Sequence, residues 1–69
     1  MGDSPLVGVV TSFDERRGLG EITDESGEVL PFHCAEIADG SRHINVGQQV
    51  SYVTKFHVTR VEAFEISPL

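Results

Sequence analysis

Five short segments rich in Val, Ile, Thr, Tyr and Phe, each bounded by Gly, Asp, Ser or Pro, dominate this sequence of 69 residues. Short β-forming runs separated by turn residues are typical of the strands of an all-β domain. The segments lie at residues 6–13, 19–23, 28–33, 49–55 and 60–67. Residues 14–18 and 24–27 have the composition of hairpin turns, so we expect the first three strands to form a meander.

The stretch from Cys34 to Gly47 lacks this alternation and contains turn sequences, which predicts a long connection. It has room for one short helical turn at residues 35–37, too short to be stable as an isolated helix. We expect residues 1–69 to form a single domain with its core within residues 6–66. A domain of this size buries only about 60% of the surface that its unfolded chain exposes. A barrel can still close at this length, because a closed sheet packs one face of every strand against the others.

Side-chain alternation assigns a face to each position of a strand. In the second and third segments it directs four residues toward the core, namely Gly20, Ile22, Leu30 and Phe32. In the last segment the apolar positions run through Val61 and Ala63 and then shift to Phe64 and Ile66. Such a shift suggests a β-bulge.

The turn at residues 25–27 sets the register between the second and third strands. If Gly27 is left-handed in a three-residue hairpin loop, Leu19 lies opposite His33 and Glu21 lies opposite Pro31. All four would then be on the outer face. Pro31 lacks a backbone N–H, so we expect its strand to lie at an edge of the sheet or to carry a bulge.

Composition limits the partners and the location of the chain. Five Lys and Arg residues against eleven Asp and Glu give a net charge of −6, which disfavours strong phosphate binding unless cations cluster locally. The single cysteine, Cys34, cannot form an internal disulfide. Residues 1–5 lack the basic start and apolar run of a secretory signal, and no stretch approaches the roughly 18 apolar residues of a membrane span. We therefore expect a cytoplasmic protein with no membrane segment.

Two motifs carry a resemblance to a known family. Residues 17–22 read Arg-Gly-Leu-Gly-Glu-Ile, and residues 30–34 read Leu-Pro-Phe-His-Cys. These segments resemble the Lys-Gly-Phe-Gly-Phe-Ile and Val-Phe-Val-His-Phe motifs of the cold shock domain family, and further matches run from about Leu6 to Ile66. The resemblance implies an all-β fold, a five-stranded antiparallel barrel of the oligonucleotide-binding (OB) type. It also implies binding of single-stranded RNA or DNA.

The sequence departs from the family at the aromatic positions on which bases stack. Non-aromatic residues occupy five of them, namely Ser12, Leu19, Glu21, Pro31 and Cys34, while His33 is retained. Stacking contributes about 1–3 kcal/mol per base, so the loss of three platforms removes roughly 3–9 kcal/mol. A micromolar complex has only about 8 kcal/mol in total. The sequence therefore predicts weak or altered nucleic-acid binding.

Eight residues are the candidates for this binding. We expect His33, Leu19 and Pro31 on the face and Phe13 at its edge, with Phe56 as a replacement aromatic. Cations at strand ends would contact phosphates from one rim, namely Arg17, Lys55 and Arg60.

An alternative is a protein-interaction module on the same barrel, with nucleic-acid binding lost. An apolar patch of Leu19, Pro31, Cys34 and Phe56 would then meet a basic protein steered by the acidic turns. Homodimerisation through this patch is a variant, so we expect a monomer or a weak dimer.

Catalysis and metal binding find no support in the pattern. His33 and Cys34 are adjacent, but structural zinc sites use four ligands with paired spacings that this chain does not have. Cys34 has no recognisable base or orienting partner. We expect no enzymatic activity, no metal site and no cofactor.

Overall fold

The computed structural model describes residues 6–38, 40, 43–57 and 60–69, and for residues 56, 57 and 60 it describes the backbone only. Its five strands are β1 (Leu6–Asp14), β2 (Leu19–Asp24), β3 (Val29–His33), β4 (Gln49–His57) and β5 (Arg60–Pro68). A short 3-10 helix, η1 (Cys34–Glu36), follows β3. The five predicted strands and the short helical turn are thus confirmed, with ends that differ by at most two residues.

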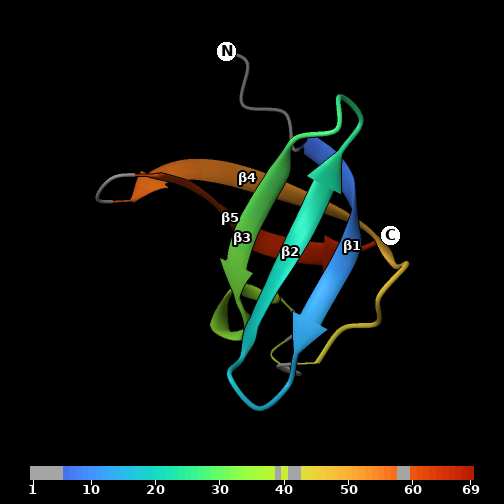
Figure 1. The fold of residues 1–69 in the computed structure, drawn as a ribbon, viewed down its shortest axis with the longest axis vertical. Coiled ribbons are helices and arrows are strands. Elements are labelled where there is room, and N and C mark those ends of the chain that lie inside the picture. Colours follow the sequence, from blue (N-terminus) through green and yellow to red (C-terminus); the bar gives the residue numbers. More distant parts are fainter. Residues whose placement is uncertain (1–5, 39, 41–42, 58–59) are drawn as a thin grey trace.

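The strands form one antiparallel sheet in the order β3-β2-β1-β4-β5 (Figure 1). The predicted barrel is only partly realised, because no ladder joins β3 to β5 within the described residues. β3 and β5 nevertheless pack against each other, and a single bridge from Ile37 to Ile66 holds the end of η1 against β5. Pro31 lies in the edge strand β3, as predicted, and has no N–H to donate to a ladder with β5. The sheet is therefore curled but open at this seam.

The turn between β2 and β3 has the predicted geometry. Gly27 is left-handed, with a φ of 92°. Leu19 pairs with His33, and Glu21 pairs with Pro31. Asp24 fixes this turn, because its Oδ1 accepts hydrogen bonds from the N–H groups of Ser26 and Glu28, both at 2.9 Å. Local turn chemistry thus sets the register of the two strands.

The core lies on the concave side of the sheet. Ten apolar side chains are buried there, namely Val10, Ile22, Leu30, Phe32, Ile37, Ile44, Val50, Tyr52, Ala63 and Ile66. The inward orientation predicted for Ile22, Leu30 and Phe32 is confirmed. Burial of each large aliphatic or aromatic side chain contributes about 1.5–3 kcal/mol, so these residues supply most of the driving force for folding.

Two bulges interrupt the alternation. In β1 the register shifts between Val10 and Ser12, and in the β4–β5 pair it shifts between Ser51 and Val53. The second shift confirms the predicted irregularity in the last strand. The inward orientation expected for Phe64 is wrong, because this side chain is only half-buried and lies outside the core cluster.

No helix in the described part of the chain has the length and apolar character needed to cross a membrane.

Candidate functional site

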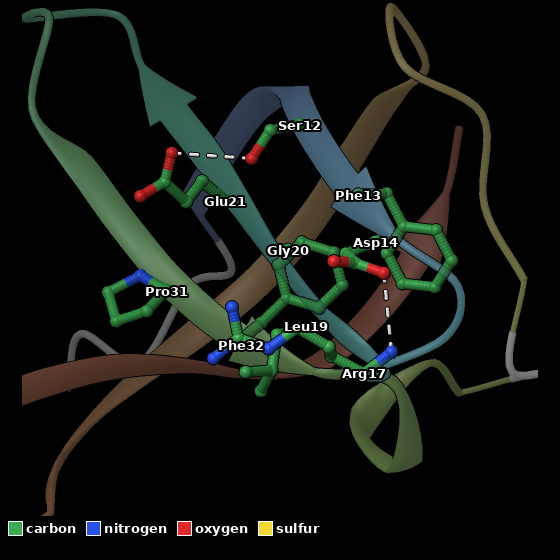
Figure 2. Close-up of a pocket in the computed structure, with 9 residues that line it drawn as sticks. All are labelled: Ser12, Phe13, Asp14, Arg17, Leu19, Gly20, Glu21, Pro31 and Phe32. Atoms are coloured by element: carbon green, nitrogen blue, oxygen red, sulfur yellow. Dashed lines mark hydrogen bonds between the residues drawn. The ribbon is translucent and has the colours of Figure 1, made fainter.

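A groove lies across the outer face of β1, β2 and β3 (Figure 2). We call it the face groove; its volume is about 400 Å³ and it is lined by Ser12, Phe13, Asp14, Arg17, Leu19, Gly20, Glu21, Pro31 and Phe32. Four of the candidate residues, Phe13, Arg17, Leu19 and Pro31, are brought together here. The centre is polar, because Ser12 Oγ donates a hydrogen bond to Glu21 Oε1 at 3.3 Å.

The depth of the face groove depends on Gly20. A Cβ atom at this position would lie 2.5 Å from Cζ of Phe32 and 2.8 Å from the carbonyl oxygen of Ser12. Such distances are far below van der Waals contact, so only glycine fits between the β1 backbone and the Phe32 ring. Gly20 therefore keeps the groove hollow down to the aromatic core.

Arg17 is positioned by the loop between β1 and β2. Oδ1 of Asp14 accepts hydrogen bonds from the N–H groups of Arg16 at 3.0 Å and Arg17 at 3.3 Å. Gly18 ends the loop with a φ of 68°, and its carbonyl accepts the N–H of Cys34 at 2.7 Å. The loop is thus tied to the start of η1, and the exposed Arg17 side chain reaches the rim of the face groove.

His33 is exposed at the end of β3. Its Nδ1 accepts a hydrogen bond from the N–H of Ala35 at 3.1 Å, which caps η1 and orients the ring. In the neutral ring this bond places the proton on Nε2. Nε2 is then a hydrogen-bond donor available to a ligand.

A second groove runs between β3 and β5. We call it the edge groove; its volume is about 320 Å³ and it is lined by Leu19, Pro31, Phe32, His33, Glu36, Glu62 and Phe64. Leu19, Pro31 and Phe32 also line the face groove, so the two hollows form one continuous surface. Both acidic residues of the edge groove, Glu36 and Glu62, lower its attraction for phosphate.

Phe64 is the site residue that sequence reasoning missed. The bulge in the β4–β5 pair follows Phe64, where Glu65 has a φ of 54°, so Ala63 and Ile66 are both buried while Phe64 faces away from the core. Nζ of Lys55 lies 5.2 Å from the centroid of the Phe64 ring, within the range of a cation–π interaction. The sequence signal was the spacing of three between the buried residues Ala63 and Ile66, which places one extra residue between two inward positions.

Phe13 occupies a different place from the one expected. Its ring is half-buried and stacked on Phe32, with centroids 6.0 Å apart and planes 6° from parallel. The bulge in β1 causes this, since it brings Phe13 opposite Gly20 rather than opposite Leu19. Phe13 therefore forms the floor at one end of the face groove and packs against the core.

The candidate cations are not gathered on one rim, contrary to expectation. Arg17 belongs to the loop between β1 and β2, which lies at the bottom of Figure 1, whereas Lys55 and the backbone of Arg60 belong to the β4–β5 hairpin at its left. Lys55 instead contacts Phe64. The side chains of Phe56 and Arg60 lie outside the described residues, so their expected roles remain predictions.

Cys34 is half-buried at the start of η1. It packs against the edge of the core, and a Cβ atom on Gly18 would lie 2.8 Å from its sulfur. Within the described residues, no group of three or more His, Cys, Asp or Glu side chains could hold a metal ion.

Ionisation is perturbed at two described groups, both away from the two grooves. Hydrogen bonds from the Ser26 hydroxyl, and then from the N–H of Glu28, lower the pKa of Asp24 below its ordinary value of 3.8. Burial raises the pKa of Tyr52 above 10.0, and the nearby carboxylates at the β2–β3 turn raise it further.

Comparison with known proteins gives two kinds of match. Cold shock protein CapB of Pseudomonas syringae pathovar tomato and that of Pseudomonas fragi are each 35% identical to this chain over 60 residues, covering 86% of this chain and 87% of the relative. The solved structure of drosophila Unr CSD456 superposes with a TM-score of 0.81 and 29% identity over 99% of this chain. This chain spans 28% of that Unr chain. No family model matches the sequence.

Proposed function

Since the chain belongs to the cold shock protein family, we propose that it binds single-stranded RNA or DNA, with lower affinity than a domain that has the full set of stacking aromatics. The observation that carries this proposal is the continuous surface of the face and edge grooves. Leu19, Pro31 and His33 lie together on it, and Arg17 stands at its rim. Stacking of bases on side-chain rings and cations at phosphates are the two components of sequence-tolerant single-strand binding, and His33 and Arg17 offer one of each.

Each residue has a distinct part in this proposal. Leu19 and Pro31 offer apolar contact to the faces of unpaired bases. His33 offers a ring to stack on, and its Nε2–H can donate to a base edge or a phosphate. Arg17 positions a phosphate at the groove rim. Bound bases are unavailable for pairing, so the protein would act stoichiometrically to keep strands open.

Reduced affinity follows from the aliphatic and acidic residues on the face. No aromatic side chain stands at Ser12, Leu19, Glu21 or Pro31, and each missing stack costs about 1–3 kcal/mol. Glu21 adds a negative charge at the centre of the face groove. The expected dissociation constant is therefore micromolar or weaker, with the tightest binding at low salt.

Fluorescence anisotropy of labelled single-stranded oligonucleotides at low and physiological salt tests the proposal. We expect His33→Ala to weaken binding by roughly 5- to 140-fold, the equivalent of one stacked base. Val29→Ala, at an exposed position near the other end of β3, should have no effect.

Arg17→Ala should weaken binding and lower the slope of log affinity against log salt by about 0.7, the value for one phosphate contact on a single strand. The matched variant Arg16→Ala removes the same charge from the same loop, but Arg16 does not line the face groove, so its effect should be smaller. The absence of saturable binding at low salt would refute the proposal.

Docking of a basic protein segment is a second candidate function. Two features favour it, the carboxylates of Glu36 and Glu62 in the edge groove and the net charge of −6. Leu19 and Pro31 would supply the apolar contacts. This function predicts binding of a lysine-rich peptide, together with no binding of oligonucleotides at moderate salt.

A further inference from the structure

Phe64 is an aromatic side chain that neither the core nor the family motifs account for. Among the aromatic rings whose side chains are described, Phe32 and Tyr52 are buried and Phe13 is stacked on Phe32. Phe64 instead lies half-buried on β5 and lines the edge groove. The part of the ring that remains exposed is therefore accessible to a ligand in this groove.

The edge groove places Phe64 beside the proposed binding residues. His33 and Pro31 come from β3 on one side of this groove, and Phe64 comes from β5 on the other. Leu19 and Pro31 continue the same surface into the face groove. A strand lying across the face groove can therefore pass directly into the edge groove and reach Phe64.

Lys55 prepares the Phe64 ring for a ligand. Its Nζ lies 5.2 Å from the ring centroid, yet Lys55 is not among the described residues that line the edge groove. The ring therefore has a cation over it outside the groove and contributes apolar surface within the groove. A cation–π contact restricts the ring, which lowers the entropy lost when a base stacks on it.

We propose that Phe64 is a relocated base-stacking platform, on which one unpaired nucleobase rests in the edge groove between β3 and β5, with Lys55 close enough to attract the phosphate of that nucleotide. This inference rests on the proposed function. It moves the aromatic contact from the β2 and β3 positions, where Leu19 and Pro31 stand, to β5. The bulge at Glu65 is the backbone device that makes the move possible.

Substitutions at Phe64 separate stacking from simple apolar packing. Phe64→Leu keeps an apolar side chain and should weaken oligonucleotide binding by roughly 5- to 140-fold, whereas Phe64→Tyr keeps the ring and should bind within about twofold of the natural protein. Lys55→Gln should lower the salt slope by about 0.7. Thermal melts of each variant verify that the fold is retained.

A tryptophan at position 64 gives a local readout, because the chain has no other tryptophan. In Phe64→Trp, a single-stranded oligonucleotide should quench the emission in step with the anisotropy change. Equal binding by Phe64→Leu and the natural protein, or unchanged emission at saturation, would overturn this inference while leaving the proposed function intact. If the natural protein binds no oligonucleotide and a lysine-rich peptide alters the emission instead, both proposals are overturned and the groove binds a basic segment.

Discussion

Restoring one aromatic residue to the face should raise the affinity for single strands. Leu19 is the best position, because it pairs with His33 and lines both grooves. Its side chain is 42% exposed, so a larger ring can extend over the surface without entering the core. Substitutions at such exposed positions usually change the free energy of unfolding by no more than about 0.5 kcal/mol. The perturbation is Leu19→Phe, which tests binding separately from folding.

The size of the gain follows from the contact that is added. One more ring on which a base can stack is worth about 1–3 kcal/mol, or roughly a 5- to 140-fold lower dissociation constant. The side chain carries no charge, so the slope of log affinity against log salt should stay the same. A gain in affinity with an unchanged salt slope therefore identifies stacking rather than a new electrostatic contact.

Anisotropy titration of one labelled oligonucleotide with the natural protein and the variant measures this gain. Val29→Phe is the matched control, because Val29 is 51% exposed on the same strand pair but pairs with Thr23, at the end away from His33. The control should leave the affinity unchanged. An equal gain in both variants, or none in Leu19→Phe while the natural protein binds, would refute the assignment of this face.

Three further predictions concern the fold that carries the grooves. Gly20→Ala should lower the free energy of unfolding by about 1–3 kcal/mol, because the added Cβ would overlap the Phe32 ring. Each kcal/mol corresponds to a fall of roughly 4–8 °C in Tm. A Tm equal to that of the natural protein would contradict the geometry. Tyr52→Phe should raise the free energy of unfolding in urea by about 1–3 kcal/mol, because the buried hydroxyl has no hydrogen-bond partner within the described residues. The natural protein should lose stability as the pH rises above 10 through the raised pKa of Tyr52, and the variant should not show this loss. A less stable variant would be the contrary result. Asp24 has a lowered pKa, so the stability that its carboxylate contributes is present above pH 3.8 and is lost as the pH falls through the folded-state pKa. Asp24→Asn should therefore flatten the dependence of Tm on pH between about pH 2 and pH 6. An unaltered profile would show that the turn does not depend on the carboxylate.

Much of the fold could be predicted because it depends on interactions between residues close in sequence. The strands follow from runs of β-forming residues between turns, and the inward positions Ile22 and Phe32 follow from strict alternation. The pairing of Leu19 with His33 follows from a tight turn that contains one left-handed glycine, Gly27. The same local reasoning placed Leu19, Pro31 and His33 on one outer face, and the resemblance to the cold shock domain family made them binding candidates.

The bulge in β1, and the place of the predicted bulge in β5, were decided by packing between strands. An extra residue in β1 moves Phe13 onto Phe32, although strict alternation directs Phe13 outward. In β5 the extra residue follows Phe64, so Phe64 faces outward and Ile66 is buried, although the sequence predicted an inward Phe64. A bulge reverses the face of every residue beyond it, and its position depends on which partner strand can accommodate the added residue. The position of a bulge therefore depends on contacts between strands and not on the local sequence alone.

What the sequence by itself determined is therefore the set of strands, the β2–β3 register and a family face depleted of aromatic residues. What only the tertiary structure decided is the open seam between β3 and β5, the edge groove along it, and the position of Phe64 beside His33 with Lys55 over its ring. The physical reason is distance along the chain. His33 and Phe64 are far apart in sequence, and they share a groove only because the curled sheet brings its two edge strands together.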